Sequence, residues 1–241
     1  VVGTHFDITE RKLAEEAEGR FRLGKVDVDA NPNLALRFSV RSIPTIMAFS
    51  QGRKVSDFAG LIPENKIIEF INNILPPSPS DLLSQKGNSL LSAGDQEGAR
   101  EAFLQALDLD ERHPASMLGL MKIFLLQGNS ADAHAIFRSF PARQEYNEAE
   151  RLVPLMKAME DFNNNRLPSD TDLDAAFTNS IRLATRGNTL ASIDGLLDIL
   201  RQDKRYRKDR ARSVLLALLD LLDPQNELTR QYRTELASIL F

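Results

Sequence analysis

A short proline-rich segment divides this chain into two parts with different patterns. The run Pro76-Pro77-Ser78-Pro79-Ser80 interrupts helices and strands alike, because proline lacks the backbone N–H and has a fixed φ. Strand patterns occur only before this run, and helical patterns dominate after it. We therefore expect an α/β domain over residues 1–75 and an all-α domain over residues 81–241. Residues 76–80 are expected to form a fairly stiff linker.

The first part opens with a strand pattern and a helix signal. Lys25–Asp29 alternates valine with aspartate, which predicts a strand. Asn31-Pro32 predicts the start of a short helix, because proline fits the first helical turn. The apolar side of that helix is expected to comprise Leu34, Leu36 and Phe38.

A β-hairpin and a helix are predicted next. Ile46–Phe49 and Lys54–Phe58 are strand-like runs separated by a turn signal at Gln51-Gly52. Pro63–Leu75 then carries isoleucines at helical spacing, which predicts a helix that closes the domain.

These elements together resemble the second half of a thioredoxin. The resemblance rests on the segments Val28–Pro32 and Val40–Thr45, the predicted hairpin, and Gly60. It implies a thioredoxin-like fold in which the Ile43–Pro44 bond is cis and lies beside the substrate groove of the active site.

The sequence contains no cysteine, so these residues offer no thiolate nucleophile, disulfide or cysteine-bound metal. The space between Phe6 and Leu13 is also too short for a strand end, a Cys-x-x-Cys turn and a full helix. One interpretation is a relative without redox activity, which is not an enzyme. The alternative is a thiol–disulfide oxidoreductase whose cysteine loop, near Asp7–Arg11, is missing from this sequence. We assign no catalytic residue and no cofactor.

A regular period marks the second part. Three positions recur after 34 residues, the length that is typical of tetratricopeptide repeats. Glycine at the turn, then a small and an aromatic residue on the second helix, complete the signature. The recurring pairs are Gly94 and Gly128, Ala99 and Ala133, and Phe103 and Phe137. Gly187, Ser192 and Leu196 repeat the pattern more weakly.

Three further helices are predicted around and after this weaker repeat. Asn147–Asn163 is expected to break or kink at Pro154. Arg210–Leu222 forms another helix, and Glu227–Phe241 is expected to cap the last repeat. The apolar face of the cap is expected to hold Tyr232, Leu236 and Leu240.

This order of domains, with an ending of the type xYRxxLxxxLF, resembles a bacterial thioredoxin–tetratricopeptide co-chaperone family, the YbbN-like chaperedoxins. The resemblance implies a cytoplasmic holdase that binds unfolding client proteins and passes them to chaperone machinery of the GroEL and DnaK types. Without cysteine, only the holding role carries over. A plain scaffold with a groove for one folded partner is the third interpretation.

The groove of the repeats is one candidate binding surface. Its candidate residues are Asn88, Leu91, Lys122 and Leu125, together with Leu126. For the leucines, burial between repeats is an equally good interpretation. A Lys and Asn clamp for an acidic C-terminal peptide would use the positions of Ser84, Asn88 and Gly119, and only Asn88 fits. Capture of that peptide type is therefore not expected.

The other candidate surface is the basic run Arg201–Arg212, which holds seven Lys or Arg residues. Arg205, Arg207 and Lys208 are candidates for docking to an acidic chaperone surface, although a solvated face between helices is the commoner role of such a run.

Only Tyr206 offers stacking, so nucleic acid is not expected. A net charge of −4 and the absence of a long apolar run point to neither nucleic acid nor membrane. His5, His113 and His134 lack metal-site spacing.

Overall fold

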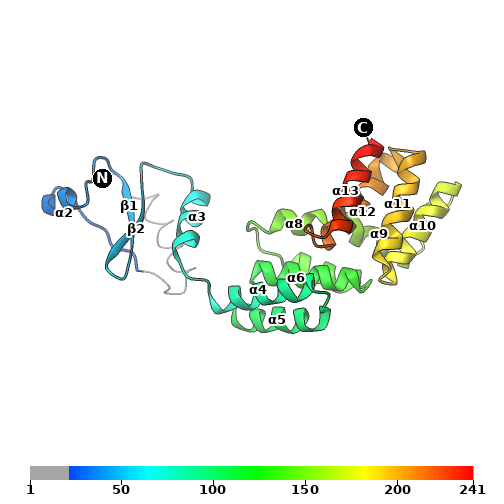
Figure 1. The fold of residues 1–241 in the computed structure, drawn as a ribbon, viewed down its shortest axis with the longest axis horizontal. Coiled ribbons are helices and arrows are strands. Elements are labelled where there is room, and N and C mark those ends of the chain that lie inside the picture. Colours follow the sequence, from blue (N-terminus) through cyan, green and yellow to red (C-terminus); the bar gives the residue numbers. More distant parts are fainter. Residues whose placement is uncertain (1–21, 241) are drawn as a thin grey trace. The chain divides into compact units, whose positions relative to one another are not determined.

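The structure is a computed structural model and describes residues 22–240 of the chain. It divides into two compact units, Val1–Pro77 and Ser78–Phe241 (Figure 1). His5 and the junction at Asp7–Arg11 lie outside the described residues. Between residues 22 and 240, no helix has the length and apolarity that a membrane crossing needs.

The first unit is built around an antiparallel hairpin. Its elements are α2 (Pro32–Arg37), β1 (Thr45–Ser50), β2 (Arg53–Ala59) and α3 (Glu64–Ile74). The register runs from Thr45 opposite Ala59 to Ser50 opposite Arg53, with a bulge after Ala48. Gln51 and Gly52 have φ values of 49° and 76°, and a two-residue hairpin turn of type I′ needs positive φ at both positions. The predicted hairpin is confirmed.

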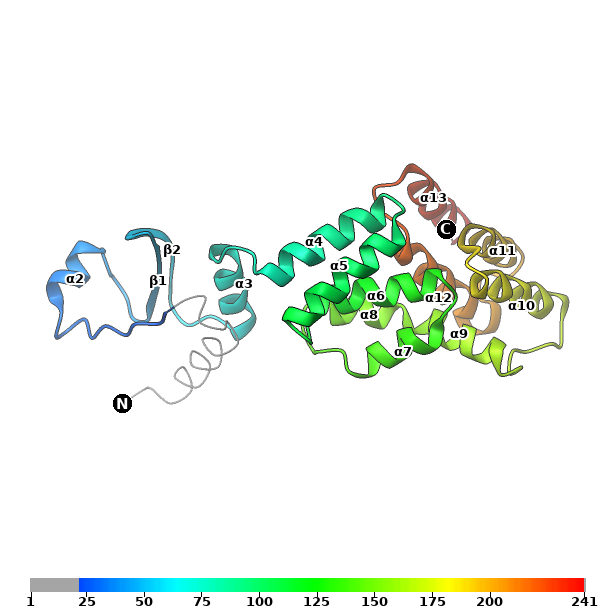
Figure 2. The ribbon, with the colours of Figure 1, turned by 90° about the horizontal axis from the view of Figure 1, so that it is seen from below.

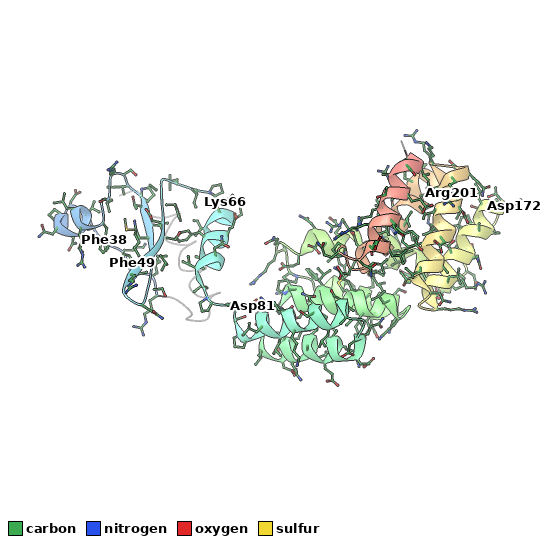
Figure 3. The ribbon with its side chains drawn as sticks, in the orientation of Figure 1. Phe38, Phe49, Lys66, Asp81, Asp172 and Arg201 are labelled. Atoms are coloured by element: carbon green, nitrogen blue, oxygen red, sulfur yellow. The ribbon has the colours of Figure 1, made fainter. Side chains whose placement is uncertain are left out.

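Two aromatic pairs fasten the helices of this unit to its strands. Phe38, which ends α2, meets Phe49 of β1 edge to face at 5.1 Å between ring centroids (Figure 3). Phe58 of β2 meets Phe70 of α3 in the same way at 5.0 Å. Edge-to-face contacts of this kind add to the stabilisation from buried area.

Two expectations for this unit are wrong. Lys25–Asp29 is not a strand, because the Asp27 carboxylate accepts the backbone N–H groups of Asp29 and Ala30 at 2.9 and 3.1 Å and folds the chain into a turn. The strands of the described part pair only with each other, so this segment has no ladder to join. Leu36 does not belong to a packed side of α2, because 78% of it is exposed.

The second unit consists of helices arranged largely in antiparallel pairs (Figure 2). They are α4 (Pro79–Ser92), α5 (Gln96–Leu109), α6 (Pro114–Leu126), α7 (Ser130–Arg138), α8 (Tyr146–Arg151), α9 (Val153–Asn163), α10 (Asp172–Thr185), α11 (Thr189–Gln202), α12 (Tyr206–Leu221) and α13 (Glu227–Leu240). The break expected at Pro154 separates α8 from α9. This two-part architecture confirms the predicted fold class.

The predicted linker is longer than the connecting segment in the structure. Ser78 caps α4 by accepting the backbone N–H of Asp81, and the Asp81 side chain accepts the backbone N–H of Ser78 in return. Pro79 then occupies the first helical turn, where its missing N–H costs nothing. Residues 78–80 therefore belong to the second unit.

Phe103 of α5 is the centre of the first repeat. Its ring is completely buried between α4 and α6. A Cβ added at Gly87 of α4 would lie 2.6 Å from the ring, and one added at Gly119 of α6 would lie 2.3 Å from it. The two glycines therefore leave the space that the aromatic ring fills.

The second repeat uses its matching phenylalanine differently. Met121 lies on α6, where Gly87 lies on α4, and it is fully buried. Phe137 is only half-buried and stacks on Tyr146 at 5.9 Å. The 34-residue period of the sequence is thus kept, but Phe137 packs against a different kind of partner than Phe103 does.

The expected cap is confirmed within the described residues. Leu236 is buried, and Tyr232 and Leu240 pack against the main core. Phe241 lies outside the description. α12 is assigned from Tyr206, but residues 207–209 have left-handed backbone, so its regular helical part begins at Arg210, as expected.

Substituting Gly119→Ala should destabilise the helical unit by about 1–3 kcal/mol, because the added methyl overpacks the Phe103 ring. Ser89→Ala on the exposed side of α4 is the control, and it should leave stability within about 0.5 kcal/mol. Urea unfolding followed by circular dichroism measures both. An unchanged midpoint for Gly119→Ala would show that the ring is not confined.

Candidate functional site

The second unit carries a groove of about 630 Å³. Its walls come mainly from α4, α6, α8 and the connection between α12 and α13, and they mix leucines with polar groups that include Glu145, Glu148 and Asp223. Four residues predicted from the sequence line it, and these are Asn88, Leu91, Lys122 and Leu126. The helices of the repeats and the C-terminal segment therefore form one concave surface.

Three other predicted positions do not offer side chains to the groove. Leu125 is 1% exposed and belongs to the core, so its assignment to the groove is wrong. Ser84 is also buried, and its hydroxyl has no hydrogen-bond partner in the part of the chain that the structure describes. Gly119 lines the groove but has no side chain to hold a peptide.

A second, charged cleft of about 530 Å³ adjoins the groove. The two share Lys122, Glu148, Leu222 and Pro224. The cleft adds residues that the sequence reasoning missed, and these are Arg151, Leu216, Asp220 and Arg233. No local motif connects them, since they come from α8, α12 and α13.

Ion pairs organise this charged cleft. Asp220 accepts from Arg151 through Nε and from Arg233 through Nη2, each at 2.8 Å. The hydrogen bond to Asp220 raises the pKa of Arg151, so its guanidinium stays charged. Lys122 lies 4.0 Å from Glu148, which is longer than a hydrogen bond.

Three of the seven cations in the basic run form ion pairs within the chain. Arg201 bonds Asp198 and Glu235, Arg207 bonds Asp170 and Asp174, and Arg210 bonds Asp161. Arg207 is therefore a structural residue as well as a docking candidate. Arg205 and Lys208 are exposed, and no ion pair in residues 22–240 engages them, so they remain docking candidates.

A buried carboxylate explains why the run folds this way. Asp174 is 0% exposed and accepts hydrogen bonds from Arg207 at 2.7 Å and from the Tyr206 hydroxyl at 2.5 Å. These bonds hold the pKa of Asp174 well below its usual range. Residues 207–209 have positive φ, a costly conformation for residues other than glycine. The bonds to Asp174 hold the first of these residues in that conformation.

The same arrangement occurs at the first repeat. Asp81 occupies the third position of α4, as Asp174 does in α10, and each belongs to a capping box. Asp81 bonds His113, 32 residues later, at 3.0 Å, just as Asp174 bonds Tyr206 at the same interval. Burial alone would raise the pKa of Asp81, but hydrogen bonds with His113 and Ser78 lower it. His113 therefore has a packing role.

The predicted cis-proline is present. The Ile43–Pro44 bond is cis, and the Pro44 carbonyl accepts the backbone N–H of Gly60 at 2.8 Å. Ile43 is 75% exposed. That these two residues lie in a substrate groove stays a prediction from the resemblance. Within the described residues, no cluster of His, Asp or Glu has the geometry of a metal site.

Comparison with known proteins identifies both units. A thioredoxin family model matches residues 6–73, and a tetratricopeptide repeat model matches residues 156–241. The second match covers the part in which the internal period of the sequence is weaker.

An uncharacterized protein of Mycobacterium tuberculosis is 26% identical over 234 residues, which cover 95% of this chain and 71% of that protein. The thioredoxin of Chlorobaculum thiosulfatiphilum is 38% identical over 61 residues, or 25% of this chain and 56% of that thioredoxin. Thioredoxin 1 of Nostoc is 34% identical over 64 residues, or 27% of this chain and 60% of its own length.

The fold and the groove thus define a helical-repeat protein of the kind that binds other proteins, joined to a small α/β unit. The chain is a fusion of a thioredoxin-type segment with tetratricopeptide repeats.

Substituting Tyr206→Phe should destabilise the helical unit by about 1–3 kcal/mol, because the buried Asp174 loses a charged hydrogen bond. Tyr232→Phe is the matched control. Its hydroxyl bonds Asp194 at 2.9 Å in an exposed setting, so its loss should cost less than about 1 kcal/mol. Equal urea midpoints for the two variants would contradict a special role of the buried pair.

Proposed function

We propose that this chain is a holdase-type co-chaperone of the cytoplasm. It holds unfolding client proteins on exposed apolar surface and docks to chaperone machinery through its repeats. The proposal assigns it no enzymatic activity. It rests on the resemblance to thioredoxin–tetratricopeptide co-chaperones and on the surfaces described above.

Exposed apolar side chains in the thioredoxin-type unit are the observation that carries the proposal. Leu36, Ile43 and Leu61 are 78%, 75% and 77% exposed. Exposed apolar side chains that lie together mark surfaces that bind other chains, and we propose that these three form such a surface. Ile43 also precedes the cis-proline, the position that the thioredoxin resemblance places beside a substrate. A thioredoxin-type unit without cysteine can still bind a polypeptide there.

The repeats supply the docking half of the proposal. Tetratricopeptide repeats stack into concave surfaces that bind proteins, and the groove and charged cleft lie on such a surface. Arg205 and Lys208 are a second docking candidate for an acidic partner, because no intramolecular ion pair engages them in the described structure.

The alternative function is thiol–disulfide exchange, which the thioredoxin relatives favour. It requires a cysteine, and the 241 residues contain none. A loop near Asp7–Arg11 would have to supply it.

In a light-scattering assay with a heat-denatured client, the chain should suppress aggregation. The triple variant Leu36→Ser, Ile43→Ser, Leu61→Ser should bind the client about a hundredfold more weakly, since three apolar contacts at ~1 kcal/mol each are lost.

The control replaces three exposed leucines of the helical unit, Leu82, Leu104 and Leu109, by serine and should retain suppression. A scaffold for one folded partner would leave scattering unchanged even with the unaltered chain, and that result would reject the holding role.

Insulin reduction separates the two candidate functions. This chain should give no rate above the background of the chemical reductant, because it has no thiolate to attack a disulfide. A gene that encodes Cys-x-x-Cys near residues 7–11, with a full-length product that reduces insulin, would establish the oxidoreductase instead.

A further inference from the structure

Carboxylates outnumber cations along the groove of the helical unit. Its lining includes Glu145 and Glu148 of α8 and Asp223 of the connection between α12 and α13. Lys122 is the one cation among the described residues that line it, and its Nζ lies 4.0 Å from Oε2 of Glu148. No described residue forms an ion pair with Glu145 or Asp223. The groove therefore offers two carboxylates that an incoming cation can neutralise.

The cations of the adjoining charged cleft do not serve these two carboxylates. Arg151 and Arg233 both bond Asp220, each at 2.8 Å. Asp223 accepts the backbone N–H of Gln225 at 2.8 Å, a bond that leaves the negative charge of the carboxylate in place. The field along the groove thus attracts a cationic partner and repels an anionic one.

Exposed leucines make the groove more than a charged surface. Leu190 of α11 and Leu228 of α13 line it and are 42% and 39% exposed. Leu91 of α4 and Leu126 of α6 lie half-buried in the same lining. A small cation would satisfy the carboxylates but would leave these leucines in water. A ligand that fits the whole groove carries apolar side chains as well as positive charge.

We propose that the groove binds an internal segment of a partner polypeptide, an amphipathic helix whose apolar face is flanked by Lys or Arg. Its apolar side chains cover Leu190 and Leu228, and its cations pair with Glu145 and Asp223. A helix presents both kinds of side chain to one groove, because residues i, i+3, i+4 and i+7 share a face. The charge of this ligand is opposite to that of an acidic peptide.

This inference deepens the docking half of the proposed function and rests on that half alone. It names the charge and the form of the segment that docks. The holding of clients is assigned to exposed side chains of the thioredoxin-type unit, so a loss of binding in the groove leaves the suppression of aggregation intact.

Fluorescence anisotropy with the full chain tests the inference. The probe is a labelled peptide with an amidated end, Leu-Lys-Lys-Leu-Leu-Lys-Lys-Leu. Two further peptides replace every leucine by serine or every lysine by glutamate. The leucine–lysine peptide should bind at least about tenfold more tightly than either, because it alone combines apolar contacts with cations.

The double variant Glu145→Gln, Asp223→Asn removes two charges and keeps the shape of the groove. It should bind the leucine–lysine peptide about fivefold more weakly, since two partly screened ion pairs are lost. The control double variant Glu101→Gln, Asp108→Asn makes the same change in net charge at exposed positions of α5 outside the groove. It should bind as the unaltered chain does.

Equal binding of the three peptides overturns the inference, as does no binding of the leucine–lysine peptide or tighter binding of the glutamate peptide. Unchanged affinity in the groove variant overturns it too. Equal weakening in the two double variants assigns the attraction to the net charge of −4 instead of the groove and has the same consequence. Light scattering is an independent readout. Failure of these binding tests with intact suppression rejects only this inference, whereas absent suppression rejects the holding role.

Discussion

The first repeat of the helical unit depends on the fit of one aromatic ring between two glycines. Phe103 occupies the space that Gly87 and Gly119 leave open, so α4, α5 and α6 approach closely at one point. The close approach sets the angle at which α6 leaves the first repeat, and Lys122 lies on α6 on the same side as Gly119. Packing in the first repeat thereby positions Lys122, which lines the groove.

Polar contacts at helix starts join helices in both the first repeat and the C-terminal part of the unit. In both Asp81 and Asp174, one carboxylate caps its own helix and also bonds a residue at the start of a later helix. A shared acceptor ties two helix starts together, since neither can shift without losing a bond to a charged group. The second of these carboxylates also bonds Arg207, the first of the three left-handed residues in the basic run.

Local chemistry made part of the molecule predictable from sequence. Gln51-Gly52 encodes a turn with positive φ, and Phe103 and Phe137 lie in register, so the hairpin and the first repeats follow from short segments. The strand expected over Lys25–Asp29 does not form, because a strand needs hydrogen bonds from a neighbouring strand. The alternation of valine and aspartate is equally compatible with a turn. Leu125 was misassigned because α6 buries residues on most of its sides, so its pattern does not distinguish Leu125 from Leu126. Arg151, Asp220 and Arg233 were missed because only the stacking of distant helices brings them together.

The final helix is more than a cover for the last apolar layer. It contributes Arg233 to the cleft, and the segment that leads into it supplies Pro224 and one side of the groove. The position of α13 and the shape of the concave surface are therefore linked, because a displacement of this helix would also displace Arg233 and the Pro224 side of the groove.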